Sequence, residues 1–229
     1  MGTVEGKDTR RCNNMLRLSF DKGDNGLRRI LCLGAHSDDI EIGCGGAILR
    51  LLNESQNVEV MWIVFSADKR RADEARCSAE QFLDKAANKE IRFEKFRDGY
   101  FPHQGACIKD YFENLKTDFA PDLVFTHSRA DYHQDHRLVS ELTWNTFRNH
   151  LILEFEVIKY DGDFGRPNVY IPLGEDTCAK KIDIILGSFK SQGTRNWFTA
   201  DTFMAVMRLR GIEINADHAE AFYGRKVSL

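Results

Sequence analysis

The sequence has little proline and no long apolar run. Only 4 of its 229 residues are proline, and no stretch approaches the roughly 20 apolar residues needed to span a bilayer. Residues 1–14 are polar and mixed in charge, without the apolar centre of a secretory signal peptide. We therefore expect a protein that is neither inserted into a membrane nor exported, and that stays in the cytoplasm.

Several sequence patterns that would define a partner or a cofactor are also missing. The six cysteines contain no Cys-x-x-Cys pair, which argues against a structural zinc cluster and a disulfide framework. The net charge is −3 and the basic groups at 69–71 and 180–181 are short, so no nucleic-acid partner is expected. The stretch Gly43–Gly46 lacks the Gly-x-Gly-x-x-Gly spacing, so we expect no nicotinamide cofactor.

Apolar runs alternate with helix-like segments along most of the chain. Strands are predicted near 30–33, 58–65, 90–93, 123–125 and 154–160, and helices near 47–52, 73–87, 108–117, 136–149 and 177–189. This alternation predicts an α/β fold, with a Rossmann-like, mostly parallel sheet and helices on both faces. Because no linker is evident, we expect an N-terminal extension over residues 1–27 and a single domain over 28–229.

The most informative segment is Ala35–Glu41, which follows the first predicted strand. In open α/β sheets, ligands bind at the carboxyl ends of the strands. His36 supplies an imidazole nitrogen, and Asp38 and Asp39 supply carboxylates, so that one can bind a metal while the other faces a metal-bound water. A catalytic zinc takes three protein ligands and leaves one position to water, so another ligand is required. We expect Gly43–Gly46 to form a tight turn that enters the next helix.

A second polar segment, 126–136, follows the predicted strand 123–125. It contains His127, His133 and His136, so the two segments hold four of the seven histidines. Polar segments at two strand ends indicate one site assembled across the end of the sheet, with the missing ligand in the second segment. The alternative is that these histidines occupy surface loops, which is the commonest location of a histidine taken alone.

The two segments resemble the signature of the PIG-L or LmbE-like family of zinc-dependent N-deacetylases. That family has a His-Pro-Asp-Asp-x-Glu segment near its start and a His-x-Asp-His segment in its middle. Arg71–Glu74 is similar to its Arg-x-x-Glu helix, and Phe96–Gly99 is similar to its Arg-Asp-Gly loop. Ser191–Gln192 and Ala219–Phe222 are also of the family's type, so the resemblance covers roughly residues 28–223 and implies a deacetylase domain over 28–229.

The resemblance implies a metal site and a base. His36, Asp39 and His136 match the family's three metal ligands, which implies one Zn²⁺ per chain or another divalent metal. Asp38 matches the general base, which takes the proton of the metal-activated water.

It also implies further catalytic and substrate-binding residues. His133 matches the histidine that, as imidazolium, steadies the oxyanion and protonates the leaving amine. Asp135 matches the carboxylate between the two histidines, where it orients or tunes His133. Arg71 and Asp98 match positions that hold the substituents of the sugar.

One residue departs from the family pattern. Ser37 stands where the family has a proline, which fixes its own φ and restricts the residue before it. We interpret the change as a less rigid loop that affects metal affinity or rate, with the site otherwise intact. Glu220 matches a family glutamate that approaches the site, with a role at a helix end or an interface as the alternative.

The function implied by the resemblance is hydrolysis of an N-acetyl group from an amino sugar or sugar conjugate. An amidase acting on a thiol-sugar conjugate, or another metal-dependent hydrolase, is a second hypothesis, and a non-catalytic sugar-binding protein is a third. A phosphoester hydrolase would need a second metal, for which the sequence offers no ligands. The resemblance also implies a homo-oligomer. It does not distinguish free, nucleotide-linked or lipid-linked sugars from precursors of antibiotics or cell surfaces.

Overall fold

The computed structural model describes residues 26–227, which form one sheet of seven strands in the order β3-β2-β1-β4-β5-β7-β6. The strands are β1 (Arg29–Gly34), β2 (Glu59–Val64), β3 (Asn88–Phe93), β4 (Leu123–His127), β5 (Leu151–Phe155), β6 (Val169–Leu173) and β7 (His218–Gly224). The helices are α1 (Asp39–Glu54), α2 (Lys69–Phe82), α3 (Gly105–Asp118), α4 (Gln134–Thr146), α5 (Glu175–Ser188) and α6 (Ala200–Glu213), with short 3₁₀ helices η1 (Phe101–Gln104) and η2 (Lys190–Gln192).

The strand order places a crevice beside β1. Strands β1 to β5 are paired in parallel, and β7 is antiparallel to both β5 and β6. From β1 the chain moves outward to β2 and β3, and then returns to form β4 on the other side of β1. The carboxyl ends of β1 and β4 therefore flank the point where the strand order reverses, which is where open α/β sheets bind ligands.

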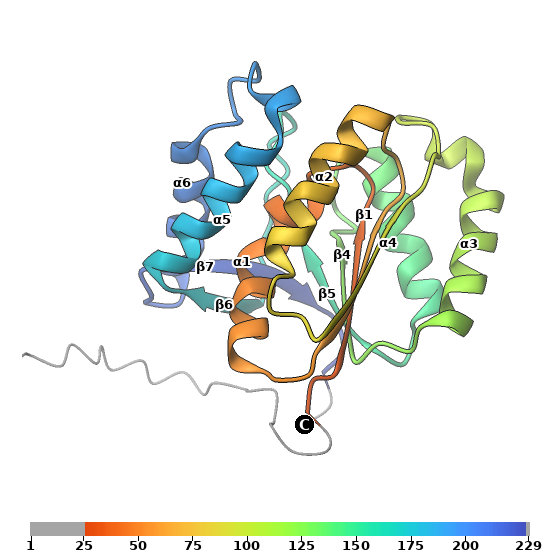
Figure 1. Cartoon of the computed structure of the whole chain (residues 1–229), viewed down its shortest axis with the longest axis horizontal. Helices are drawn as coiled ribbons and strands as arrows, with labels where there is room; N and C mark the ends of the chain where they lie inside the picture. Colours follow the sequence, from red (N-terminus) through yellow and green to blue (C-terminus); the bar gives the residue numbers. More distant parts are fainter. Residues whose placement is uncertain (1–25, 228–229) are drawn as a thin grey trace, which may run out of the picture.

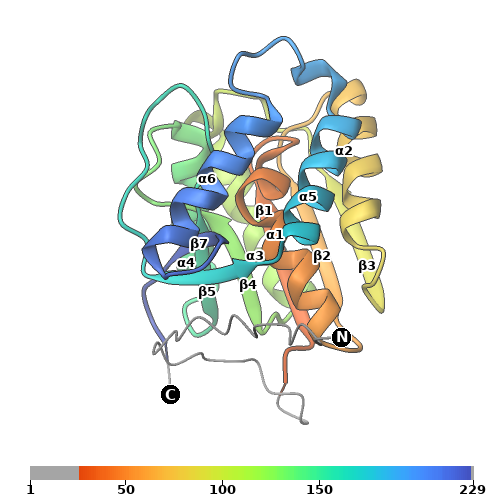
Figure 2. The same ribbon diagram turned by 90° about the vertical axis from the view of Figure 1, so that its left-hand side faces the viewer.

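Helices cover both faces of the sheet, as Figures 1 and 2 show. One face carries α1, α2, α5 and α6, and the other carries α3 and α4. Side chains of β1 alternate between the two cores: Ile30 and Cys32 pack on the α1 side, and Leu31 and Leu33 pack on the α3 side. A parallel strand whose side chains are apolar on both faces of the sheet must be buried on both faces. The predicted α/β architecture is confirmed.

The C-terminal part of the fold differs most from the prediction. The strand expected over 154–160 is β5 and ends at Phe155, and residues 156–168 form a loop before β6. Helix α6 and strands β6 and β7 were not predicted. In α6 buried Phe203 and Met207 lie on the same helix as exposed Leu209 and Ile212, so the sequence lacks the one-sided apolar pattern of a surface helix.

Residues 1–25 of the predicted N-terminal extension lie outside the described residues, whereas Leu27 is buried in the core. Within residues 26–227, no helix combines the length and the apolar composition needed to cross a bilayer. The cytoplasmic location stays a prediction.

The glycines after the first polar segment lie inside α1, so the tight turn predicted there is wrong. A Cβ added to Gly43 would lie 2.2 Å from Phe155 Cδ2, and one added to Gly45 would lie 2.7 Å from Phe82 Cε1. Such distances are far below van der Waals contact. Glycine is required here because α1 packs closely against β5 and α2, and this packing fixes the start of the helix at Asp39.

A buried ion pair holds the middle of the same helix. Lys181 Nζ lies 2.5 Å from Glu220 Oε1, and the two carboxylate oxygens accept the backbone N–H groups of Gly46 and Ala47 at 2.8 and 2.7 Å. Lys181 also donates to the carbonyl of Ile42 at 2.7 Å, the group that Gly46 would bond in a regular helix. Glu220 therefore fixes α1 from β7.

We predict that Gly43→Ala destabilises the protein by about 1–3 kcal/mol or more, because the new methyl group overlaps the ring of Phe155. Gly187→Ala is the matched control: Gly187 lies in α5 with open space around it, and alanine there raises helix stability by up to about 1 kcal/mol. Urea unfolding of both variants measures the difference. Equal stability of the two variants would contradict the close packing of α1.

Candidate metal centre

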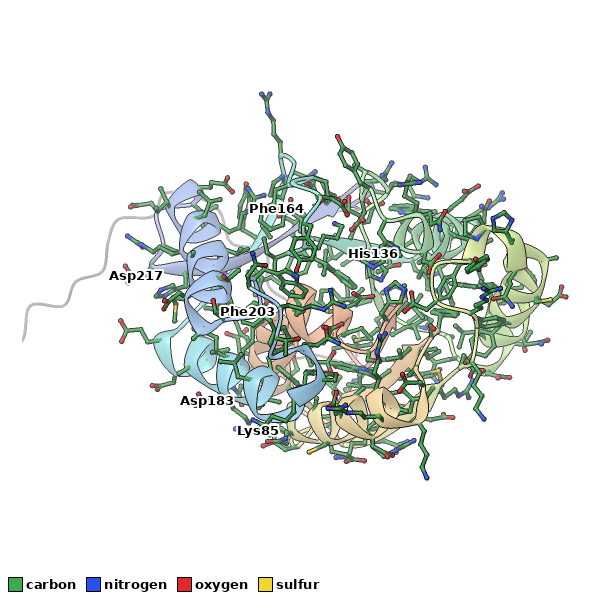
Figure 3. All side chains as sticks on the ribbon, turned by 90° about the horizontal axis from the view of Figure 1, so that it is seen from above. Lys85, His136, Phe164, Asp183, Phe203 and Asp217 are labelled. Atoms are coloured by element: carbon green, nitrogen blue, oxygen red, sulfur yellow. The ribbon has the colours of Figure 1, made fainter. Side chains whose placement is uncertain are left out.

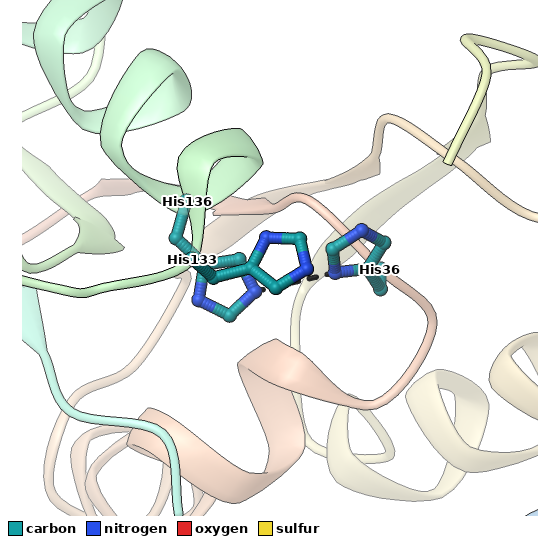
Figure 4. Close-up of side chains that lie close together, drawn as sticks. All are labelled: His36, His133 and His136. Carbon is teal, nitrogen blue, oxygen red and sulfur yellow. Dashed lines mark hydrogen bonds between the residues drawn. The ribbon is translucent and has the colours of Figure 1, made fainter. Parts of the chain in front are cut away.

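The three predicted metal ligands meet at the crevice between β1 and β4. His36 follows β1, Asp39 is the first residue of α1, and His136 lies in the first turn of α4. His36 Nδ1 is 3.2 Å from His136 Nε2, and Asp39 Oδ2 is 3.5 and 3.4 Å from these two nitrogens. Figure 3 looks onto this end of the sheet, with His136 near the middle of the molecule, and Figure 4 shows the two histidines facing each other.

These distances fit a tetrahedral metal ion. Two ligand atoms that each lie about 2.1 Å from a tetrahedral zinc are roughly 3.4 Å apart. All three pairs of ligand atoms are within 0.2 Å of this value. Two nitrogens and one carboxylate oxygen are also a donor set that zinc accepts in catalytic sites. The residues present therefore fit one divalent metal.

The local charges favour a cation at this point. Burial and then the neighbouring His127 lower the pKa of His136 to about 4, so its imidazole is neutral, as a ligand must be. Burial alone would raise the pKa of Asp39, but the adjacent His136 and His127 outweigh it and hold the carboxylate ionised. Burial would lower the pKa of His36, but hydrogen bonds to Asp135 and Asp39 raise it. A positive charge, whether proton or metal, is thus favoured among these atoms.

Asp135 orients His36. Its Oδ2 lies 3.2 Å from His36 Nε2 and accepts the N–H of Gly99 at 2.7 Å, while Oδ1 accepts the N–H of Phe101 at 3.1 Å. The resemblance assigns this carboxylate to His133. In the structure its side chain contacts His36 and not the ring of His133, and its charge only partly offsets the lowering of the His133 pKa by burial and by His36.

Two further residues support His136 and were not among the predicted site residues. Asp131 Oδ2 lies 2.9 Å from His136 Nδ1, so that Nε2 is left for the metal. His127 is fully buried, stacks on His136 with the ring centroids 3.9 Å apart, and accepts the N–H of Ala35 through Nε2 at 2.9 Å. The surface-loop alternative is therefore wrong for His127 and His136. The only sequence signal for Asp131 was its position, since it is an acidic residue two positions before His133 in the second polar segment.

His133 lies beside the predicted metal ligands. Its ring centroid is 4.8 Å from that of His36 and 4.6 Å from that of His136. Burial, followed by the charge of His36, lowers its pKa. Its Nδ1 accepts the N–H of Asp135 at 3.3 Å, which places the proton of the neutral ring on Nε2. The lowered pKa and this hydrogen bond favour a neutral ring that carries its proton on Nε2.

Asp38 has the properties of a base. It stands at the N-cap of α1, but its side chain makes no capping hydrogen bond. Burial, and then the charge of Asp39, raises its pKa to about 6. A buried carboxylate with increased proton affinity, close enough to Asp39 and His36 to feel their charges, suits proton transfer near neutral pH.

Arg71 and Asp98 lie together at the edge of the site. Arg71 Nη1 is 3.2 Å from Asp98 Oδ2, and Asp98 Oδ1 is 3.3 Å from His36 Nε2. The hydrogen bond from His36 lowers the pKa of Asp98 to about 2 against the opposing effect of burial. Both residues line a cavity of about 680 Å³ between the start of α2 and the end of β3, a volume typical of small-molecule sites. Phe93 and Phe96 line it too.

The fold and the site define an α/β protein with a candidate metal centre at the reversal point of its sheet. The sequence model of the family described as PIG-L, GlcNAc-PI de-N-acetylase, matches residues 31–147, which contain both polar segments. The chain belongs to this family and is an enzyme of the N-deacetylase type.

Solved structures share the fold at low sequence identity. N,N′-diacetylchitobiose deacetylase from Pyrococcus horikoshii is 20% identical, with a TM-score of 0.66 over 86% of this chain and 84% of that chain. The 4-carboxy-2-hydroxymuconate hydratase GalB from Pseudomonas putida KT2440 is 17% identical, with a TM-score of 0.64 over 89% and 98%. The zinc-inhibited form of teicoplanin deacetylase Orf2 is 13% identical, with a TM-score of 0.66 over 86% and 97%. One fold therefore carries deacetylases and a hydratase.

We predict that the purified wild type binds about one divalent metal per chain and that His136→Ala loses most of it, because two ligands hold zinc much less tightly than three. His103→Ala is the control, since His103 is exposed and in none of the candidate ligand groups among the described residues. Elemental analysis after zinc reconstitution measures the content. Equal metal content in wild type and His136→Ala would contradict the assigned ligand set.

Ser37 generates a stability prediction. Its side chain is buried, and its hydroxyl has no hydrogen-bond partner among residues 26–227. Ser37→Pro restores the family residue, removes this hydroxyl and restricts the unfolded chain, so we expect about 0.4–1 kcal/mol of added stability. Thermal unfolding should then show an increase of about 1–4 °C in Tm. A lower Tm would show that the loop has a backbone conformation that proline cannot adopt.

Proposed function

We propose that the chain is a metal-dependent hydrolase, with Zn²⁺ as the first candidate metal, that removes an N-acetyl group from an amino sugar or a sugar conjugate. The observation that carries the proposal is the triangle of ligand atoms from His36, Asp39 and His136 beside the uncapped carboxylate of Asp38. Family membership supports the reaction class.

Asp38 performs the first proton transfer. A divalent metal at this site supplies acidity to a water molecule and polarises the acyl oxygen. The carboxylate of Asp38 accepts the proton of the attacking water, and its raised pKa makes it a stronger base than an exposed aspartate. The same carboxyl group then holds a proton that it can return to the leaving amine.

His133 stabilises the developing negative charge. Its Nε2–H is the free donor of a neutral ring that is held in place by the N–H of Asp135. A fixed donor of this kind strengthens its hydrogen bond as the acyl oxygen becomes an oxyanion. The resemblance also assigns protonation of the amine to His133, but the low proton affinity of the ring favours Asp38 for this role.

Arg71 and Asp98 bind the polar groups of the substrate. The guanidinium and the carboxylate together present donors and acceptors that match sugar hydroxyl groups. They also line a cavity of about 680 Å³ beside the site, which has the size of sites for drug-sized ligands and could take a group attached to the sugar, although no predicted metal ligand lines it. The proposal therefore includes conjugates as well as free amino sugars.

The second candidate is another metal-dependent hydrolase. Phosphoester hydrolysis with two metals requires a second ligand set, and His36, Asp98 and Asp135 form such a group. However, this group shares His36 with the first site, and its Asp135 already accepts the N–H groups of Gly99 and Phe101. This arrangement supports one metal. A sugar-binding protein without turnover would have no use for the base that the proposal assigns to Asp38, whose carboxylate makes no capping hydrogen bond to α1.

We predict that Asp38→Asn lowers kcat/KM for acetate release by about 10²–10⁴-fold while the metal content stays near that of wild type, because the amide cannot accept the proton. Asp110→Asn is the matched control, since Asp110 is exposed on α3. The assay measures free acetate from free, nucleotide-linked and conjugated N-acetyl sugars.

The metal is varied in the same assay, because a relative with this fold is described as zinc-inhibited. Stoichiometric Zn²⁺, Co²⁺, Ni²⁺ and Mn²⁺ are compared on the apoprotein. Acetate release by Asp38→Asn at the wild-type rate would remove Asp38 from the mechanism. A wild type that binds metal but acts only on non-acylated or phosphorylated substrates would favour the second candidate.

A further inference from the structure

The loop between β5 and β6 reaches the metal centre through a buried lysine. Lys159 lies in this loop, residues 156–168, and its side chain is 12% exposed. Its Nζ is 3.1 Å from Asp131 Oδ2 and 2.6 Å from Asp163 Oδ2. Both carboxylates are at most 5% exposed. One largely buried ammonium group therefore joins two carboxylates that are almost fully buried.

Asp131 connects this lysine to the metal ligand. Its Oδ2 lies 2.9 Å from His136 Nδ1, and its Oδ1 accepts the N–H of His133 at 2.7 Å. The same carboxylate thus holds the ring of a metal ligand and the backbone of the neighbouring histidine. A carboxylate behind a liganding histidine fixes both its tautomer and its ring orientation.

The loop is attached to the same segment at a second point. Asp163 Oδ2 accepts the N–H of Tyr132 at 2.8 Å, in addition to its contact with Lys159. Among the described residues, Lys159 is the lysine or arginine that forms an ion pair with Asp131. Without its ammonium group, Asp131 and Asp163 would be two buried carboxylates with no cation between them.

We propose that Lys159 is a positioning residue for the metal centre, which holds Asp131 in the orientation that aims His136 Nε2 at the metal. The loop 156–168 is then part of the metal site, although it contributes no ligand. This inference rests on the proposed metal function. It assigns a role to a residue that lies 23 positions after His136 and outside both sequence segments that define the family signature.

The test is the affinity of the apoprotein for Zn²⁺, measured by competition with a chromophoric chelator. Asp131→Asn should weaken binding by about 10–100-fold, and Lys159→Met by about 10-fold. Lys159→Arg should recover most of the affinity, because arginine keeps the charge and the donors. In the Asp131→Asn background, Lys159→Met should have little further effect, since both changes act through the same hydrogen bond to His136.

The controls separate positioning from folding. Lys180→Met removes an exposed lysine that pairs with Asp84, and it should leave Zn²⁺ affinity unchanged. Thermal unfolding of each apoprotein checks that the variant is folded, and Lys159→Gln replaces Lys159→Met if the latter is not. Wild-type Zn²⁺ affinity in Lys159→Met would overturn the positioning role. So would an equal loss of affinity when Lys159→Met is introduced into the wild type and into Asp131→Asn. Failure of the wild type itself to bind Zn²⁺ would instead overturn the proposed function.

Discussion

The structure depends on bringing three ligand atoms together inside the protein. The atoms of His36, Asp39 and His136 lie 3.2–3.5 Å apart at the carboxyl ends of β1 and β4, where their lone pairs repel one another unless a positive charge lies among them. Such an arrangement persists only if each side chain is held from behind. Asp39 accepts the N–H of His36, and Asp135 and Asp131 hold the outer nitrogens of the two histidines. The site is therefore preorganised for a cation by the hydrogen bonds behind the two histidines and by the N–H that Asp39 Oδ2 itself accepts from His36.

The position of Asp39 depends in turn on contacts far along the chain. Asp39 begins α1, and α1 lies where it does because its glycines allow Phe155 and Phe82 to approach the helix axis. The buried pair of Lys181 and Glu220 adds polar contacts to the middle of the same helix. The C-terminal elements thus contribute no predicted ligand, but they determine where one ligand stands. This explains why the fold extends beyond the segments that carry the chemistry.

The sequence predicted which residues meet at the crevice better than it predicted the residues that hold them in place. Strand ends followed by His36 and His136 are local patterns, and the resemblance added the roles of individual residues. The contacts of Asp131, Lys159 and Glu220 join residues that are distant in sequence, so no local pattern signals them. The glycines of α1 were assigned to a turn because glycine is most common there, whereas tertiary packing required them inside a helix. Helix α6 was missed because apolar side chains occur on its exposed side as well as its buried side.

The pKa of His133 bears on a role that the motif implies. The motif implies an imidazolium, but burial and the adjacent charge of His36 lower the pKa of this ring in the metal-free protein. A divalent metal held by His36, Asp39 and His136 would add positive charge beside His133 and would further oppose protonation of this ring. The neutral ring still carries a proton on Nε2, so it can donate a hydrogen bond without being a strong acid. In the proposed mechanism, proton transfer to the amine is therefore assigned to Asp38, whose carboxyl group has taken up the proton of the water.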